Sequence, residues 1–201
     1  MNLNLDINRS INHILLKKNY LSKIVLIGGH SRVGKSLFAK ILKEKIESRG
    51  FRAMNISMDL WLKPLKKRKP NSTVIERHRT NECQNAIDSL LKGRAIKFNS
   101  YNFITRNYDI IPKKIRPPTS PYILIVDGVV TLMNNYLRSK SILNIYIQTN
   151  NFIRLKRLIR FYRSVKNIDR NTYKKIIKKR ESEEINFINK SKKYADLLVL
   201  N

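Results

Sequence analysis

The sequence predicts an α/β fold, a three-layer α/β/α sandwich around a mainly parallel sheet, on three observations. First, apolar runs typical of buried strands occur at 23–27, 122–128, 142–147 and 195–200. Second, segments with helical spacing of apolar residues lie between these runs. Third, the 201 residues suit one domain, and no repeat or linker divides them. Strands that alternate with helices indicate a parallel sheet with helices on both faces.

The segment 29–36 is the strongest local signal in the chain. It reads Gly29, His30, Ser31, Arg32, Val33, Gly34, Lys35 and Ser36. This fits the phosphate-binding loop pattern G-x-x-x-x-G-K-[ST] at every required position, between a predicted strand and a predicted helix. A chance match in a Gly/Ser turn would rarely have both flanking elements. We therefore expect a P-loop NTPase fold that binds a nucleoside triphosphate, with Lys35 at the β- and γ-phosphates and Ser36 at Mg²⁺.

The remaining elements follow from periodicity and turn residues. We expect a leading amphipathic helix within 1–20, a strand at 51–58, a loop at 63–72 and helices at 74–91, 150–165 and 170–190. The region 94–120 shows no sustained period, and a segment of that length usually has functional content. Side chains expected to pack on the body are Leu3, Leu5, Ile7, Ile11, Ile14 and Leu15 in the first helix, and Leu37, Ile41, Leu42 and Ile46 after the loop.

Composition limits the class of protein. The net charge is +28, but Lys and Arg are spread over nearly every segment and no basic run is interleaved with aromatic residues, so no specific nucleic-acid partner is expected. The charge should still favour anionic substrates. No signal peptide or membrane-spanning stretch is recognised, and the single Cys83 is expected to be structural. A cytoplasmic protein without a membrane partner is the natural interpretation, and a homo-oligomer is compatible with it.

Two acidic residues follow predicted strands. Asp59 comes after the second strand and Asp127 ends the most apolar one. Ligands of open α/β sheets bind at the carboxyl ends of strands, beside the phosphate-binding loop in this case. Two carboxylates there could support Mg²⁺ and accept the proton of a substrate hydroxyl, although strand-end Asp residues can also merely cap loops.

The helix at 150–165 carries an arginine face. On a wheel of about 100° per residue, the apolar side consists of Leu155, Leu158, Ile159, Tyr162 and Val165. Arg157 and Arg160 lie nearly opposite, flanked by Arg154 and Arg163. A solvated basic face is one interpretation. The other is a lid, at about 150–170, that closes arginines over a transferring phosphate.

This set of motifs resembles the uridine kinase-like branch of P-loop kinases, which also includes phosphoribulokinase, pantothenate kinase and nicotinamide riboside kinase. The similar segments cover most of the chain and lie at 29–36, 57–61, 90–103, 126–129, 154–160 and 193–196. The resemblance implies that Asp59 contacts the acceptor hydroxyl and serves as base. It also implies that Trp61 and Tyr101 belong to the acceptor side, that Asp127 supports Mg²⁺ and that the arginines form a lid.

The sequence departs from the family pattern at the acceptor. Asp127 stands where Glu is usual, Asn102 follows Tyr101 in place of Asp, and Arg106 takes the place of the base-reading His. Phe161 replaces the Asp that follows the last lid arginine. These changes leave phosphoryl transfer in place but do not favour uridine. Arg106 is expected to bind an anionic or carbonyl group of the acceptor, or else to be exposed to solvent.

We therefore expect an Mg²⁺-dependent kinase that moves the γ-phosphate of ATP to a hydroxyl of a small molecule. The predicted catalytic residues are Asp59, Lys35, Arg157 and Arg160; those for the acceptor are Asp59, Trp61, Tyr101 and Arg106; those for the metal are Ser36 and Asp127. The acceptor is left open among nucleosides, vitamins and sugars. The alternative from another class is a P-loop ATPase that drives a nucleic-acid or protein partner.

The last predicted helix carries charge on its apolar side. Arg180 and Glu184 project from the sector that holds Tyr173, Ile176, Ile177, Phe187 and Ile188. Residues four apart on a helix can pair. We expect Arg180 to face the nucleotide and lid region and Glu184 to fix its orientation, unless this end of the helix has left the body.

Overall fold

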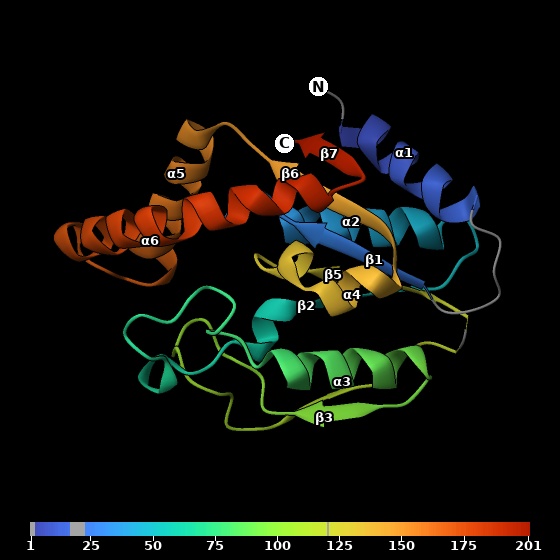
Figure 1. Cartoon of the computed structure of the whole chain (residues 1–201), viewed down its shortest axis with the longest axis horizontal. Coiled ribbons are helices and arrows are strands. Elements are labelled where there is room, and N and C mark those ends of the chain that lie inside the picture. Colours follow the sequence, from blue (N-terminus) through green and yellow to red (C-terminus); the bar gives the residue numbers. More distant parts are fainter. Residues whose placement is uncertain (1–2, 17–22, 120) are drawn as a thin grey trace.

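The computed structural model describes residues 3–16, 23–119 and 121–201. Its main sheet has five parallel strands in the order β2-β5-β1-β6-β7, and the fold prediction is confirmed (Figure 1). The strands are β1 (Lys23–Gly28), β2 (Ala53–Ser57), β5 (Ile123–Asp127), β6 (Ser141–Gln148) and β7 (Leu197–Leu200). Because all five run in the same direction, their carboxyl ends meet at one edge, with β1 in the centre.

Six α-helices surround this sheet in the described part of the chain: α1 (Leu3–Leu16), α2 (Lys35–Glu47), α3 (Thr80–Leu91), α4 (Asn135–Lys140), α5 (Asn151–Arg160) and α6 (Arg170–Lys190). A π-helical turn, Phe161–Val165, continues α5. α1 corresponds to the predicted leading helix, and the rest of its predicted range, 1–2 and 17–20, lies outside the described residues. None of the helices in these ranges is both long and apolar enough to cross a bilayer.

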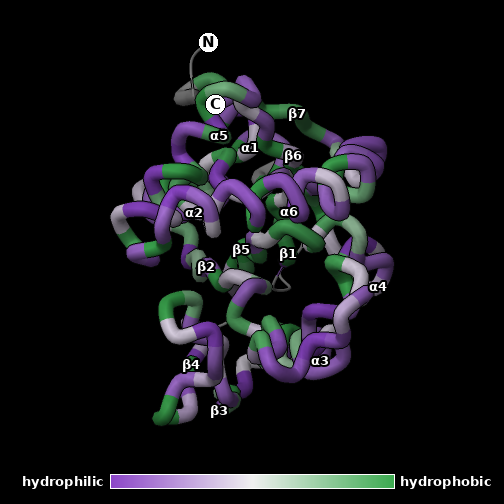
Figure 2. The backbone as a smooth tube through the Cα atoms, turned by 90° about the vertical axis from the view of Figure 1, so that its left-hand side faces the viewer, coloured by the Kyte–Doolittle hydropathy of each residue, from purple (hydrophilic) through white to green (hydrophobic). Residues whose placement is uncertain are grey.

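The core lies on both faces of the sheet, as strand alternation requires. Val25 and Ile27 of β1 pack under α1 and α2. Ile24 and Leu26 point the other way and pack with residues of α3, α4 and α6. Figure 1 shows α1 and α2 on one side of the strands and α3 and α4 on the other. In Figure 2 the strands β1, β5 and β7 of the main sheet are mainly hydrophobic, whereas α3 and α6 consist largely of hydrophilic residues. Cys83 is buried in this core, which agrees with a structural role.

The acceptor-side region differs most from the prediction. The helix expected from residue 74 begins only at Thr80, because the segment before it is held in turns: Lys63 N donates to Arg77 O at 2.8 Å and Arg79 N to Trp61 O at 2.8 Å. The region 94–120 contains a small antiparallel pair, β3 (Ile96–Phe98) with β4 (Lys113–Ile115), which periodicity did not predict. Strands of three residues are too short to show alternation.

Several helix faces are rotated relative to the predicted ones. Leu5 and Leu37 are 58% and 55% exposed. The buried face of α2 consists of Lys35, Phe38, Ala39, Leu42 and Ile46. It shares Leu42 and Ile46 with the predicted face but does not include Leu37 or Ile41. Val165 is exposed because the π-helical turn departs from 100° per residue. The side chains of Leu3 and Leu15 lie outside the described part.

Candidate functional site

The phosphate-binding loop connects β1 to α2 and depends on two glycines with positive φ. Gly29 has φ +131° and Gly34 has φ +100°, a region that side chains other than glycine rarely adopt. A Cβ atom at Gly29 would lie 2.2 Å from the carbonyl oxygen of Ile147 on β6. Arg32, between them, also has a positive φ, +68°. The loop is therefore tightly curled against the carboxyl ends of β1 and β6.

Lys35 begins α2 and is buried inside the curl. Its Nζ donates to the carbonyl oxygen of His30 at 2.7 Å, so the side chain closes the loop on itself. Burial lowers the pKa of Lys35, while the carboxylates of Asp59 and Asp127 oppose that shift. A buried ammonium in this position is suited to anionic phosphate oxygens, which would satisfy it better than one carbonyl does.

Ser36 and Asp127 meet beside Lys35. Ser36 Oγ donates to Asp127 Oδ2 at 2.9 Å, and Asp127 is 3% exposed at the end of β5. Burial raises the pKa of Asp127 to about 6; the Ser36 hydroxyl lowers it and Asp59 raises it further. A hydroxyl and a carboxylate of this kind fit Mg²⁺, which commonly takes one or two carboxylates together with phosphate oxygens. The described residues contain no cluster of three His, Cys, Asp or Glu that would hold a metal by themselves.

Asp59 stands in the short 3₁₀ turn Met58–Trp61 that follows β2. The side chain of Asp59 is half exposed, and its Oδ1 lies 3.8 Å from Nε2 of the buried His78. Nδ1 of His78 is 2.9 Å from the carbonyl oxygen of Val74, which can only accept, so Nδ1 carries a proton. Partial removal from water favours the protonated form of Asp59, but His78, Lys35 and Arg180 outweigh this and lower its pKa.

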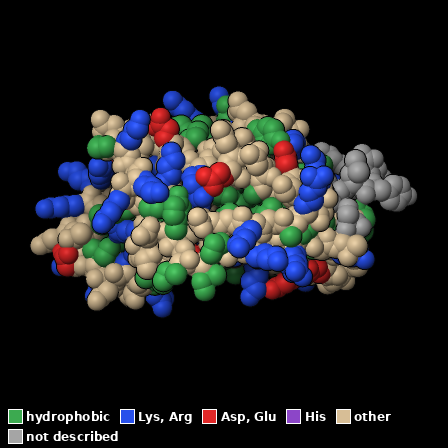
Figure 3. Space-filling model, turned by 90° about the horizontal axis from the view of Figure 1, so that it is seen from below, with side chains coloured by type: hydrophobic (Ala, Val, Ile, Leu, Met, Phe, Trp, Pro, Cys, Tyr) green, Lys and Arg blue, Asp and Glu red, His purple; other side chains and the backbone are tan. Residues whose placement is uncertain are grey.

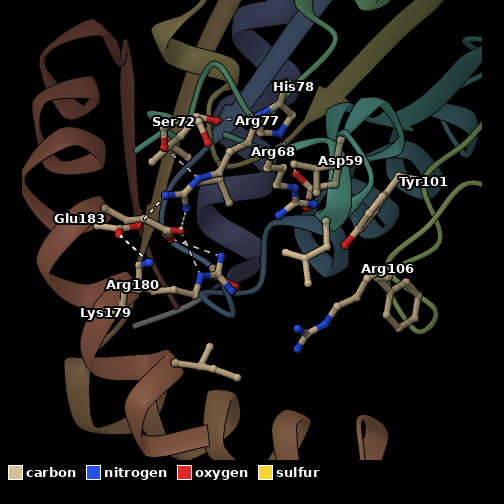
Figure 4. Close-up of a pocket in the computed structure, with 18 of the residues that line it drawn as sticks. Asp59, Arg68, Ser72, Arg77, His78, Tyr101, Arg106, Lys179, Arg180 and Glu183 are labelled. Carbon is tan, nitrogen blue, oxygen red and sulfur yellow. Dashed lines mark hydrogen bonds and ion pairs between the residues drawn. The ribbon is translucent and has the colours of Figure 1, made fainter. Parts of the chain in front are cut away.

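A cavity of about 460 Å³ opens in front of Asp59. The loop residues Ser31 and Arg32 form one end of its wall, and α6 forms another side with Lys179, Arg180 and Glu183. Figure 4 shows Asp59, Tyr101 and Arg106 on the side opposite α6, with Arg106 extending into the open space. The structure therefore brings together three residues that the sequence assigned to the acceptor: Asp59, Tyr101 and Arg106.

Trp61, the fourth residue predicted at the acceptor, lies elsewhere. Its side chain is fully buried and stacks on Phe98 of β3 with ring centroids 4.4 Å apart. It does not line the cavity. The aromatic residue two positions after Asp59 turns inward because the 3₁₀ turn directs it into the core, so it supports the acceptor side without direct access to a substrate.

The predicted lid arginines have different surroundings. Arg157 lies beside the loop, since its Nη1 is 4.0 Å from the position a Cβ atom would take at Gly34. Arg160 is exposed and forms no ion pair within the described chain. Arg154, expected beside the exposed face, is instead buried, and its guanidinium pairs with Glu181 of α6. One further contact joins loop and lid: the Arg32 guanidinium lies 3.5 Å from the centroid of the Phe161 ring.

Arg180 and Glu184 form the predicted pair on α6, and two further residues join them. Arg180 Nε donates to Glu184 Oε1 at 3.0 Å and its Nη1 to the hydroxyl of Tyr162 at 3.0 Å. Arg77, before α3, also donates to Glu184 Oε1 at 3.0 Å. Burial would lower the pKa of Arg180, but Glu184 and Tyr162 raise it above its ordinary value. Glu184 thus joins Arg77, before α3, to Arg180 of α6, which in turn contacts Tyr162 of the π-helical turn.

Arg68, Arg77, His78 and Lys166 are among the cavity residues that the sequence did not assign to the site. Two signals point to them. His78 is one of only three histidines, and Arg68 belongs to the densest basic run of the chain. His78 falls within a predicted helix and Arg68 within a predicted loop, and nothing local indicates that Lys166 reaches the same cavity.

Comparisons with known proteins agree with the fold. The sequence profile of the Phosphoribulokinase / Uridine kinase family matches residues 24–201. No curated protein sequence is similar enough to the chain to be called a relative.

Similar folds occur among solved structures at low sequence identity. A candidate fructose transport system kinase from Silicibacter sp. TM1040 has a TM-score of 0.76 at 13% identity, covering 99% of both chains. A candidate uridine kinase from Bacillus stearothermophilus has a TM-score of 0.68 at 18% identity, covering 98% of this chain and 99% of that one. D-glycerate 3-kinase from Cryptococcus neoformans has a TM-score of 0.52 at 11% identity, covering 79% of each chain. At such identities the likeness concerns the fold.

Proposed function

The chain belongs to the Phosphoribulokinase / Uridine kinase family, and we propose that it is a cytoplasmic, ATP-dependent kinase of a small molecule. The observation that carries this proposal is the position of Asp59. Its half-exposed carboxylate faces a cavity of about 460 Å³ whose wall continues into the phosphate-binding loop. A hydroxyl placed at Asp59 would therefore lie close to the phosphates that such a loop holds.

The residues in and around the phosphate-binding loop each have a part in this proposal. Lys35 binds the β- and γ-phosphates, and Arg157 adds positive charge from the lid where negative charge develops. Ser36 and Asp127 would hold Mg²⁺, which would neutralise phosphate charge. Arg160 has no partner within the described residues and is proposed to reach the phosphates when the lid closes.

Asp59 acts on the acceptor. Its carboxylate orients the attacking hydroxyl and accepts the proton as the oxygen bonds to the γ-phosphorus and the bond from that phosphorus to the β–γ bridging oxygen breaks. ADP and the phosphorylated acceptor are the products. His78 lies behind Asp59, with its Nε2 3.8 Å from Oδ1 of Asp59, and is one of the groups that lower the pKa of Asp59.

The acceptor class is not limited to nucleosides. Proteins of this fold include a candidate uridine kinase, a candidate fructose transport system kinase and D-glycerate 3-kinase, so a nucleoside, a sugar or a hydroxy acid would be compatible with it. The alternative of an ATPase that drives a macromolecular partner has less support, because Asp59 faces a concave site of small-molecule size.

The proposal is tested by measuring ADP release with ATP and Mg²⁺ against a panel of nucleosides, sugars, sugar phosphates and hydroxy acids. We expect stimulation by at least one small acceptor. Lys35→Ala should reduce the stimulated rate about 10²–10³-fold, the usual effect of losing one donor to developing charge. Lys45→Ala, an exposed lysine of the same helix, is the control. Equal rates in the two variants, at equal melting temperatures, would remove the loop assignment.

A further inference from the structure

The cavity in front of Asp59 carries more positive charge than its own acidic groups neutralise. Its wall has eight Lys and Arg side chains and three Asp and Glu side chains. Glu183 and Glu184 are already paired with cations of the same wall, and Asp59 faces His78. Within the described residues, the cations of this wall without a carboxylate in ion-pair distance are Arg32, Arg68, Lys69, Arg106 and Lys166.

Four of these five cations come from segments outside the nucleotide loop, and three of the four are partly buried. Arg68 belongs to the loop after β2, Arg106 to the turn between β3 and β4, and Lys166 to the end of the lid. Arg32, by contrast, is part of the phosphate-binding loop, and Lys69 is exposed. The positive charge at Arg68, Arg106 and Lys166 is therefore separate from the charge that serves ATP.

Arg68 and Arg106 both have free hydrogen-bond donors. Arg68 Nε donates to the carbonyl oxygen of Lys63 at 2.8 Å, but its buried Nη2 has no partner in the described chain. Arg106 makes no side-chain hydrogen bond to any described residue, and it extends into the open space of the cavity (Figure 4). Guanidinium groups with free donors are suited to the planar or tetrahedral oxygens of carboxylate and phosphate.

The backbone at Arg106 is fixed in an unusual conformation. Its φ is +58°, which costs free energy for a residue with a side chain. Two hydrogen bonds hold it there: Arg106 N donates to Asn102 O at 2.9 Å, and Leu65 N to Arg106 O at 3.0 Å. The turn thus presents the side chain from a defined position beside the loop that carries Arg68.

Lys166, which follows the π-helical turn, completes the group. Burial is the main cause that lowers its pKa to about 8, and the charges of Arg106, Arg32, Arg180 and Arg68 contribute to the same shift. Like charges that face one another in a concave site repel until an anion lies between them. The three segments are therefore arranged for a bound anion.

We infer that the acceptor carries an anionic oxygen group, a phosphate or a carboxylate, which Arg106, Arg68 and Lys166 bind while its reacting hydroxyl lies at Asp59. This inference rests on the proposed kinase reaction and narrows the acceptor to a phosphorylated or carboxylated small molecule. Because Lys166 belongs to the lid, the anion would also draw the lid toward the acceptor side.

The first test compares acceptors that differ in one charged group: ribose 5-phosphate with ribose, and glycerate with glycerol. The two pairs separate phosphate from carboxylate. We expect stimulated ADP release with the anionic member of at least one pair and little with its neutral counterpart. Arg106→Gln should raise KM for that acceptor about 10- to 100-fold, as expected for lost charge-assisted hydrogen bonds, with KM for ATP nearly unchanged. Arg94→Gln, an exposed arginine outside the cavity, is the control.

The second test does not need turnover. The protein is saturated with Mg²⁺ and a non-hydrolysable ATP analogue, and inorganic phosphate or malonate is titrated by calorimetry. We expect saturable binding of one anion to the wild type and to Arg94→Gln, weakened about tenfold or more in Arg106→Gln.

The two tests separate the inference from the proposed function. Anion binding without stimulation by any acceptor would contradict the kinase and leave the anion site in place. Three results would overturn the inference. They are stimulation by neutral acceptors alone, absence of anion binding to the nucleotide-bound wild type, and a change in KM for ATP, instead of KM for the acceptor, in Arg106→Gln.

Discussion

Asp59 and Asp127 are carboxylates at the ends of neighbouring strands, yet their surroundings move their pKa values in opposite directions. Asp59 is half exposed to the cavity, and His78 together with nearby cations lowers its pKa. Asp127 is buried behind Ser36, and burial raises its pKa to about 6. Such divergence often separates the roles of paired acidic residues. An ionised Asp59 can orient a hydroxyl, whereas Asp127 is stabilised by gaining a cation.

The assignment of Asp59 predicts the effect of Asp59→Asn. The amide keeps the size of the side chain but accepts no proton, so turnover should fall about 10²–10⁴-fold. The affinity for ATP should change little, because the proposed partner of Asp59 is the acceptor. Acceptor-dependent ADP release and nucleotide binding by calorimetry measure the two quantities. Near-normal turnover would show that Asp59 is not the base.

The assignment of Asp127 predicts that Asp127→Asn loses Mg²⁺-dependent turnover without losing stability. A raised pKa in the folded state means that ionised Asp127 destabilises the protein above pH 6, by up to about 3 kcal/mol for a shift of two units. The amide removes this cost. Its melting temperature in EDTA should therefore equal or exceed that of the wild type at pH 8.

The stability gained in Asp127→Asn should depend on pH. It should be full above pH 6 and should disappear below the ordinary Asp pKa of 3.8, where residue 127 of the wild type is protonated in both the folded and the unfolded state. A variant that melts earlier than the wild type at pH 8 would show that the carboxylate is needed for structure.

At the scale of elements, α6 is the part that joins the two sides of the cavity. Arg180 and Glu184 on this helix bond to each other, to Tyr162 of the lid and to Arg77 before α3. His30 of the phosphate-binding loop also bonds to Asn189 of α6 at 2.8 Å. One helix therefore contacts the loop, the lid and the acceptor side, so a shift of α6 would move all three together.

This arrangement predicts coupling between Arg180 and Glu184. Glu184→Gln should lower turnover and leave nucleotide binding in place, because it loosens Arg180 and Arg77 without touching the loop. The double variant, Arg180→Gln with Glu184→Gln, should lose less turnover, expressed as free energy, than the two single variants added together. The exposed pair Lys43 and Glu47 on α2, also four residues apart, provides the matched cycle, in which turnover should not change. Additive effects on turnover at positions 180 and 184 would mean that the pair is independent of catalysis.

Lys166, where the lid meets the acceptor side, predicts a pH effect. It is charged below about pH 8 and neutral above, so KM for an anionic acceptor should rise from pH 7 to pH 9. A bound anion will raise the pKa of Lys166 and so move this transition to higher pH. Lys166→Met should flatten the profile, and Lys156→Met, an exposed lysine of α5, should not.

Unfolding would not explain such a loss of affinity. The folded-state pKa of Lys166 lies below its ordinary value of 10.5, so the stability contributed by this group increases between pH 8 and 10.5. A profile identical in wild type and Lys166→Met would contradict a role of this lysine at the acceptor.

At the scale of the whole molecule, the net charge of +28 has two parts. Most cations are scattered: on the face in Figure 3, Lys and Arg side chains alternate with hydrophobic, acidic and other residues. The cavity wall is different, because its surplus of cations is gathered in a concave site. Concave sites of one sign focus the field and attract the opposite charge.

This distribution predicts a specific salt effect. From about 20 mM to about 300 mM NaCl the Debye length falls from roughly 20 Å to roughly 6 Å, so kcat/KM for an anionic acceptor should fall while kcat changes little. A neutral acceptor should show a weaker dependence. Polynucleotide should not stimulate ATP turnover at low salt. Stimulation by polynucleotide without a small acceptor would favour the alternative of a partner-driven ATPase.

The sequence by itself determined the parts that depend on neighbouring residues. The phosphate-binding loop is contiguous, and its glycines, lysine and serine act through local backbone geometry, so the segment 29–36 could be identified directly. The strands β1 and β5 are buried along nearly their whole length, so each contains an uninterrupted apolar run. The position of Asp127 at a strand end followed from the α/β pattern, whereas the order of the strands in the sheet came from the structure.

Only the tertiary structure brought the cations of the proposed anion site together. They stand at positions 68, 106 and 166, and no local pattern connects residues so far apart. The same reason explains Trp61, which the sequence placed at the acceptor and the fold buries against Phe98. It also explains Arg154, whose burial depends on Glu181 of another helix. Charge on a side chain is visible in a sequence, but whether it meets solvent, a carboxylate or a cavity depends on which distant segments the packing brings beside it.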